Sequence, residues 1–338
     1  MRILHGAHQQ LRKYGHTRVS WAQKLYYGLI KNDYLVQTFS DRDVAAFEAP
    51  LGIRELGKRA ANKRLLQTVE AFAPELVIVG HCDIISNATL QAIRDLQPGV
   101  VIAGANNDPL FVPENAAKIA HRCEVVDAMF VSTGEVELQR FAGKRARLLH
   151  MPNPVDPAIE NFDSSQRTDL RHDLIFCSKS EAYTERGTTV EYLREHLGDA
   201  ISFYTPGSYG VPGVWGRDYD LALADSRMGL NLNRQEGLHW YSSARMAQMG
   251  GNGLLVFTHR SGGFDSLFPP ESLVYFASPE ELLQQVQAFH ADDDRRRHWA
   301  GNTRAFFHRE INSTLYARYI VEASLQRTYS HDYVWCEG

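Results

Sequence analysis

Polar and charged side chains follow two neighbouring strand-like runs in the first half of the sequence. His81 comes after one apolar run, and Asn106, Asn107 and Asp108 come after the next. An imidazole or a carboxylate in such a place can act as a general base or bind a hydroxylated ligand, although turn and capping chemistry explains the same residue types. We therefore take His81 and Asp108 as candidate catalytic residues.

The second half contains a denser stretch of possible ligand-binding groups, again directly after an apolar run. Residues 233–243 combine amide, cationic, hydroxyl and aromatic side chains. The candidates in this stretch are Arg234, His239, Tyr241, Ser242 and Ser243. A surface loop is the alternative interpretation of this composition.

A helix expected over Tyr241–Met249 extends this stretch. It would place Tyr241, Arg245 and Gln248 on one face, because positions i, i+4 and i+7 align along a helix. That face is too polar for a core stripe, so Arg245 and Gln248 join the candidate site.

Two further cations, Lys179 and Arg186, flank the expected start of another helix. Free N–H groups and the positive end of the helix dipole favour anions there, and a cationic side chain adds to the attraction. These residues are suited to a diphosphate, while solvated surface cations are the alternative.

Alternating apolar and amphipathic segments predict the framework that positions these residues, namely α/β units around parallel sheets. Strands are expected at Arg2–His5, Tyr34–Phe39, Leu76–Val79, Val100–Ala103, Ala128–Ser132, Arg147–Met151, His172–Cys177, Ala200–Tyr204, Met228–Leu232, Gly253–Thr258 and Leu273–Phe276. Helices are expected at Thr17–Lys31, Arg54–Ala73, Asn87–Leu96, Thr188–Leu197, Asp218–Ala224, Tyr241–Met249 and Pro279–Phe289, and from about Asp292 to Leu325.

A proline-rich segment at 151–157 interrupts this alternation and separates two similar halves. We expect an N-terminal domain at 1–150, a linker at 151–169, a second domain at 170–312, and a C-terminal helix and tail at 313–338. Two such halves form a cleft, and ligands of open α/β sheets bind at the carboxyl ends of the strands. Gly6 and His8, after the first strand, are expected to line the N-terminal side of that cleft.

Composition excludes several classes of protein. The 338 residues carry a formal charge of −4, so binding of nucleic acid through bulk positive charge is not expected. The four cysteines are far apart and form no metal-binding spacing, which fits a reducing cytoplasm and predicts no metal site. No signal peptide or membrane-spanning run is evident. The acidic run 292–294 stands beside the basic run 295–297 and is interpreted as a solvated charge run.

The sequence from 243 to 257, an apolar strand preceded by Gly-Gly-Asn-Gly, and the later segment 268–282 together resemble the C-terminal half of group 1 glycosyltransferases. The similarity is greatest to the spore-maturation-protein-like (CgeB-like) branch. Segments 107–111, 215–219 and 228–233 also resemble that branch, and the similarity runs from about Leu76 to Leu325.

The resemblance implies a GT-B fold, in which two Rossmann-like domains face each other across a cleft and the last helices cross back to the first domain. It implies a nucleotide-sugar donor on the C-terminal half, a hydroxyl acceptor on the N-terminal half, and transfer without a metal or other cofactor, with retention favoured. Arg234 and Arg245, with Lys179 and Arg186, would then stabilise the diphosphate leaving group. Gln248 stands where the family has a ribose-binding glutamate.

Two other functions remain open: a non-hydrolysing nucleotide-sugar epimerase, and a non-catalytic protein that binds nucleotides or carbohydrates. The first would change a nucleotide-sugar without an acceptor. Glutamine at position 248, in place of the family's glutamate, favours the non-catalytic binding protein. Basic residues at 58–64 and 144–147 suggest peripheral contact with the inner face of a membrane, where a glycan or lipid-linked acceptor would be found, although a solvated helix face is the alternative.

Overall fold

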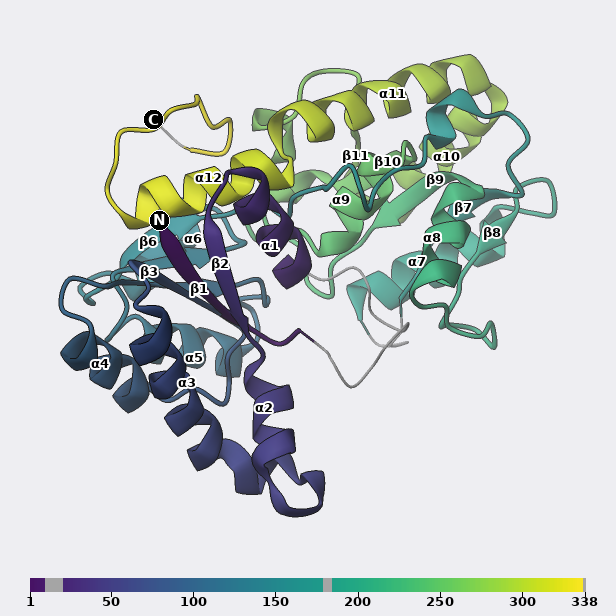
Figure 1. Ribbon diagram of the computed structural model, residues 1–338. Helices are drawn as coiled ribbons and strands as arrows, with labels where there is room; N and C mark the ends of the chain where they lie inside the picture. The colour runs from purple at the N-terminus through teal and green to yellow at the C-terminus, as the bar shows by residue number, and fades with distance from the viewer. Residues whose placement is uncertain (10–20, 179–183, 337–338) are drawn as a thin grey trace. The chain divides into compact units, whose positions relative to one another are not determined.

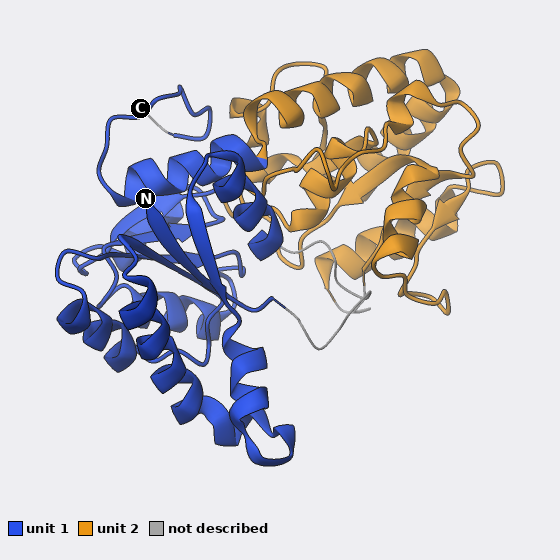
Figure 2. Ribbon diagram, viewed as in Figure 1, with its two compact units in different colours: residues 1–151, 313–338 blue, residues 152–312 orange. Residues whose placement is uncertain are grey.

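The computed structural model describes residues 1–9, 21–178 and 184–336. The chain forms two compact units (Figures 1 and 2). Unit 1 comprises Met1–Met151 and Ser313–Gly338, and unit 2 comprises Pro152–Asn312. Within the described residues, no helix is both long and apolar enough to cross a membrane.

Unit 1 is built on a six-stranded parallel sheet in the order β2-β1-β3-β4-β5-β6. The strands are β1 (Arg2–Ala7), β2 (Leu35–Phe39), β3 (Leu76–Gly80), β4 (Val101–Asn106), β5 (Ala128–Val131) and β6 (Arg147–His150). The strand order reverses between β1 and β3, where ligands of open α/β sheets bind at the carboxyl ends. Strand β3 is buried along its whole length, as expected for a central parallel strand covered by helices.

The helices of unit 1 are α1 (Trp21–Lys31), α2 (Asp41–Glu48), α3 (Lys58–Phe72), α4 (Asn87–Leu96), α5 (Pro113–Arg122), α6 (Glu135–Leu138) and α12 (Ser313–Ser324). Short 3-10 turns lie at Pro50–Gly52, Arg54–Gly57 and Gln139–Phe141. Helix α4 has the predicted bounds. Its start is fixed by Ser86, whose hydroxyl accepts from the Thr89 N–H. Helices α2 and α5 were not expected from the sequence.

The C-terminal helix α12 belongs to unit 1, so the predicted return of the chain is observed. It packs against α1, where the Trp21 indole N–H donates to the Tyr316 hydroxyl. Gly28 allows this contact, because a Cβ there would lie 2.0 Å from the Ser313 carbonyl oxygen. The Tyr319 hydroxyl donates to the His150 carbonyl at 3.0 Å and ties α12 to the end of β6.

Unit 2 repeats the same strand order on a smaller scale. Its parallel sheet runs β8-β7-β9-β10-β11 from one edge to the other. In chain order these are the second, first, third, fourth and fifth strands of the unit, as β2-β1-β3-β4-β5 are in unit 1. The strands are β7 (His172–Ile175), β8 (Phe203–Tyr204), β9 (Ser226–Asn231), β10 (Leu255–His259) and β11 (Val274–Phe276). The reversal lies between β7 and β9. The prediction of two Rossmann-like parallel-sheet domains is confirmed.

The helices of unit 2 are α7 (Glu185–His196), α8 (Arg217–Ala224), α9 (Ala244–Gly251), α10 (Pro279–Ala291) and α11 (Asp293–Glu310). Helix α10 begins as predicted, with the Ser278 hydroxyl accepting from the Glu281 N–H. The segment 151–169, expected as a linker, packs onto unit 2: the Val155 N–H donates to the Ile311 carbonyl, and Asp156 is fully buried.

The prediction of a solvated charge run at 292–297 was wrong for Arg296. This side chain is fully buried in unit 2. Its guanidinium pairs with Asp293 at 2.7 Å and donates to the carbonyls of Ser164 and Arg167. Arg296 therefore links α11 to the segment 164–167 by hydrogen bonds, although its neighbours in the sequence are charged.

Candidate functional site

Two arginines converge on one buried aromatic ring where the strand order of unit 2 reverses. Phe176 directly follows β7 and is fully buried. The guanidinium carbon of Arg186 lies 5.9 Å from the centre of its ring, and that of Arg245 lies 5.0 Å from the same centre. The sequence placed both arginines among the candidates, and the structure brings them together.

Arg245 comes from the first turn of α9. It donates to the Leu232 carbonyl at 3.1 Å, at the end of β9. Among the described residues, no carboxylate lies within ion-pair distance of it, and burial lowers the pKa of its guanidinium. A charge that is held in a buried place without a counter-ion favours an anionic ligand.

A cavity of about 450 Å³ lies beside these residues, lined by the first turn of α7 and by residues that follow β9, β10 and β11. Arg186 lines it, together with Glu236 and His259. The Glu236 carboxylate accepts from the backbone and side-chain amides of Asn233, and burial raises the pKa of Glu236. Carboxylate, imidazole and guanidinium thus border one cavity of ligand size.

The start of α9 differs from its prediction. The helix begins at Ala244, so Tyr241 lies before it and does not share a face with Arg245 and Gln248; that prediction was wrong. Ser243 has a φ of −73° and a ψ of 162°, an extended conformation, so the helix begins after it. Tyr241 is buried, and its carbonyl accepts from the Asn233 side chain.

The other candidates around α9 have different surroundings. Ser243 is the residue before the helix, and its hydroxyl is buried with no hydrogen-bond partner. The Ser242 carbonyl accepts from the Asn153 side chain at 2.9 Å. The Gln248 side-chain oxygen accepts from the buried Tyr219 hydroxyl at 3.0 Å, so part of its accepting capacity is already used.

Arg186 is the one unit 2 candidate among the described residues that line the cavity; the others with described positions, Arg234, His239, Tyr241, Ser242, Ser243, Arg245 and Gln248, do not line it. Arg234 is exposed on the loop after β9. The His239 ring stacks on Trp240 with their centres 4.8 Å apart. Lys179 lies outside the described residues.

In unit 1, the predicted residues gather at the carboxyl ends of β1, β3 and β4. His81 Nδ1 lies 3.6 Å from the Asp108 carboxylate, and His81 Nε2 is hydrogen-bonded to the Asn107 side-chain oxygen. His8, His81, Asn107 and Asp108 line a cavity of about 320 Å³. Gly6 lies inside β1, one residue short of its end.

Turn chemistry is present here as well. The Asn106 side-chain oxygen accepts from the Asp108 N–H at 2.7 Å, so Asn106 supports the turn that carries its neighbours. The Asn107 oxygen can only accept, so its hydrogen bond with Nε2 of His81 forms in the tautomer that is protonated at Nε2. The free base of the group is therefore Nδ1 or the Asp108 carboxylate.

Sequence reasoning did not place Glu236 and His259 in the site. His259 was missed because the strand was expected to end at Thr258, whereas β10 includes His259 as its last residue. Its Nε2 faces the Ala277 carbonyl and its Nδ1 faces the Ser261 hydroxyl. The described residues contain no cluster of three or more histidine, cysteine, aspartate or glutamate side chains that could hold a metal ion.

Residues 186–322 match the family described as “Glycosyl transferase-like”. A solved sucrose-phosphate synthase from Thermosynechococcus elongatus has a TM-score of 0.67 at 12% identity, over 96% of this chain and 98% of that one. Residues 186–322 are therefore similar to the glycosyl transferase-like family, and the chain has a GT-B fold. These findings support the prediction of a group 1 glycosyltransferase but do not test its assignment to the CgeB-like branch.

The same GT-B fold occurs in the Anabaena HepE protein in complex with UDP-glucose, with a TM-score of 0.61 at 12% identity over 96% of this chain and 100% of that one. It also occurs in a proposed UDP-N-acetylglucosamine 2-epimerase from Listeria monocytogenes, with a TM-score of 0.59 at 11% identity over 97% of each chain. Curated protein sequences gave no match. The fold alone thus does not separate transfer from epimerisation.

Proposed function

We propose that this GT-B protein transfers a sugar from a nucleotide-sugar, bound by unit 2, to a hydroxyl group of an acceptor bound by unit 1. The observation that carries the proposal is the pair Arg186 and Arg245 around Phe176, within or next to the residues that match the glycosyl transferase-like family. The HepE neighbour with UDP-glucose supports a nucleotide-sugar donor of this kind.

The chemical demand of the reaction is the charge that develops on the departing nucleoside diphosphate. Fixed cations in a site sheltered from water stabilise such charge without reorganising at the moment of reaction. Arg186 and Arg245 would supply it together with the N-terminus of α9, and the proposed transfer uses no metal. Glu236, half-buried at the cavity wall, would accept from hydroxyl or amide groups of the donor.

We propose a retaining reaction, in which the leaving phosphate accepts the proton of the attacking hydroxyl. His81 and Asp108 would then position the acceptor rather than deprotonate it. An inverting reaction would instead need Asp108 or Nδ1 of His81 as base. Alanine at Asp108 separates the two: retention predicts a raised acceptor KM with a modest loss in kcat, and inversion predicts a loss in kcat of about 10²-fold or more.

The test of the donor site starts with a thermal-shift screen of UDP, GDP, CMP, ADP and dTDP, because a ligand that binds only the folded protein raises its Tm. One of them is expected to bind. Replacing Arg245 with alanine should then lower kcat/KM by about 10²–10³-fold. Arg194→Ala is the matched control: it lies on α7 and contacts Tyr209 rather than Phe176. Absence of any nucleotide shift, or equal effects of the two variants, would refute the proposal.

The two other functions give different results in one further assay. An epimerase converts the nucleotide-sugar when no acceptor is present, whereas a transferase requires the acceptor for sugar transfer. A non-catalytic binding protein shows a nucleotide shift but no turnover with any acceptor. The match to the glycosyl transferase-like family over residues 186–322 favours transfer over both.

We also propose that unit 1 contacts the cytoplasmic face of a membrane through the end of α2 and the segment that joins it to α3. Four large apolar side chains are exposed there: Phe47 at 65%, Leu51 at 96%, Ile53 at 46% and Leu56 at 63%. Exposed cations follow directly on α3, at positions 58, 59 and 63. Apolar side chains that insert and cations that face anionic headgroups are the two attractions of a peripheral membrane site.

Vesicle co-sedimentation tests this contact. The protein is expected to bind vesicles that contain anionic lipid more tightly than neutral ones, and Leu51→Ser combined with Phe47→Ser should reduce binding at least tenfold. A double change of two exposed residues elsewhere on unit 1, Leu96→Ser and Val136→Ser, is the control. Binding that ignores anionic lipid and both double variants would refute the contact.

A further inference from the structure

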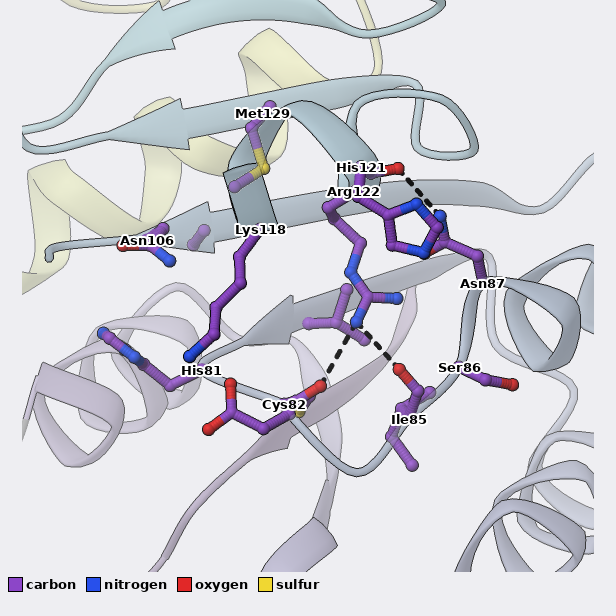
Figure 3. Close-up of a pocket in the computed structure, with 13 residues that line it drawn as sticks. His81, Cys82, Ile85, Ser86, Asn87, Asn106, Lys118, His121, Arg122 and Met129 are labelled. Carbon is purple, nitrogen blue, oxygen red and sulfur yellow. Dashed lines mark hydrogen bonds between the residues drawn. The ribbon is translucent and has the colours of Figure 1, made fainter. Parts of the chain in front are cut away.

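A second cavity of unit 1 adjoins the site described above: among the described lining residues the two cavities share His81, and the rest of their linings differ. It has a volume of about 270 Å³ and opens at the carboxyl ends of β3 and β4. Helix α5 contributes Lys118, His121 and Arg122 to its lining, and the segment between β3 and α4 faces them (Figure 3). The volume suits one charged group with a sugar ring rather than a long glycan.

Positive charge in this cavity is only partly balanced by the protein, through the longer-range attraction of Asp83 and Asp41 for Arg122. Lys118 and Arg122 are four residues apart on α5 and so project from one face, where like charges repel. Among the described residues, neither has a carboxylate within ion-pair distance. Asp83 is the one carboxylate among the described lining residues, and it pairs with Arg42.

Arg122 keeps unused hydrogen-bonding capacity inside the cavity wall. Its Nη2 donates to the carbonyls of Cys82 and Ile85, at 3.2 Å and 2.8 Å, and these bonds hold the β3–α4 segment (Figure 3). Its Nη1 is buried and has no acceptor. Burial also lowers the pKa of this guanidinium, which measures the unfavourable solvation of its charge. A buried donor without a partner is costly, and an anion would supply the missing acceptor.

A neutral acceptor lies in the same wall. The Asn87 side-chain nitrogen donates to the His121 carbonyl at 2.7 Å, as Figure 3 shows, while its oxygen is buried with no partner. A hydroxyl group of a ligand could donate to that oxygen. The cavity therefore offers cationic donors together with one acceptor, which is the complement of an anion that also carries hydroxyl groups.

We propose that this cavity binds an anionic group of the acceptor, a saccharide that carries a phosphate or a carboxylate. The identification of the ligand as the acceptor rests on the proposed function. The binding of a hydroxylated anion in this cavity does not depend on it. Lys118 and Arg122 contact the anionic oxygens, and Asn87 accepts from a neighbouring hydroxyl. Acceptors without the anionic group bind more weakly.

The test uses the full chain and four probes: inorganic phosphate, glucose 6-phosphate, glucuronate and glucose. Binding is measured by calorimetry in an Arg245→Ala background, so that phosphate bound at the donor site does not contribute. Glucose 6-phosphate or glucuronate is expected to bind at least tenfold more tightly than glucose, and the tighter of the two identifies the anionic group. Inorganic phosphate should compete with it.

Lys118→Ala should weaken that binding about tenfold or more, because one charge-assisted hydrogen bond is lost. Lys118 is exposed, so this variant is expected to fold. Arg59→Ala, an equal change of charge on α3 outside the cavity, is the matched control. Equal affinity for glucose and the anionic sugars, or equal effects of the two substitutions, would overturn the inference. Nucleotide binding measured on the protein with Lys118 and Arg245 both intact keeps the outcomes distinct. If nucleotides bind there while none of the anionic probes binds the Arg245→Ala protein, only this inference falls.

Discussion

Replacing His5 with leucine should remove an acid-sensitive component from the stability of unit 1. His5 lies in β1 with no exposed surface, and neither ring nitrogen has a hydrogen-bond partner. Its ring meets Trp21 edge-on, with the centres 6.2 Å apart. Leucine therefore loses no hydrogen bond and keeps an apolar contact with the indole.

The magnitude follows from the pKa of His5. Burial lowers this pKa from 6.5 to about 4, since the cationic form loses its hydration. Because the folded pKa is the lower one, the unfolded chain binds the proton more tightly, and stability falls as pH falls from 6.5 towards 4. The shift corresponds to roughly 3 kcal/mol in full, of which about 2 kcal/mol is lost between pH 7 and pH 5.

The assay is urea unfolding at pH 7 and pH 5, followed by hydrogen exchange of β1 peptides so that the signal reports on unit 1. The wild-type protein should lose about 2 kcal/mol more than His5→Leu between these pH values. His5→Met serves as a second apolar variant in case leucine disturbs the packing against Trp21. If both variants lose as much stability on acidification as the wild type, the reasoning about an unpaired buried imidazole is wrong.

Three further predictions concern packing and the donor site. Gly28→Ala should destabilise unit 1 by about 1–3 kcal/mol in urea unfolding, because its Cβ collides with the backbone of α12, whereas Gly301→Ala, with room for a Cβ on α11, should not destabilise the protein. Arg296→Ala should cost about 1–3 kcal/mol in the same assay, since it removes a fully buried side chain that donates to the carbonyls of Ser164 and Arg167 and pairs with Asp293. Tyr219→Phe should leave the fold intact but shift the KM for the donor, because it releases the Gln248 oxygen; an unchanged KM would exclude Gln248 from donor contact.

Periodicity and capping carried most of the fold prediction. Buried parallel strands are continuous apolar runs, so strands such as β3 and β4 were recognised within a few residues. The start of α9 was misplaced because the aromatic and hydroxyl residues of 241–243 continue a helical pattern, whereas the backbone is still extended at Ser243.

The site was predictable where chemistry follows strand ends and unpredictable where it depends on distant partners. Arg186 and Arg245 were candidates by type and position, but only the folded chain shows that both contact Phe176. Arg296 was misinterpreted because its neighbours are charged, whereas its carbonyl partners lie at Ser164 and Arg167, more than a hundred residues away. The unsatisfied nitrogen of Arg122 likewise depends on packing that no local pattern encodes.

The division of unit 1 between the two ends of the chain has a consequence for biosynthesis. While the ribosome is still adding residues beyond 312, unit 2 is already complete in sequence, whereas unit 1 lacks α12. The α1 surface around Trp21, which α12 covers, therefore stays uncovered until residues 313–324 have been synthesised. Nascent chains stalled before Ser313 should thus expose this apolar surface and bind chaperones. Chains long enough to include α12 should no longer bind them.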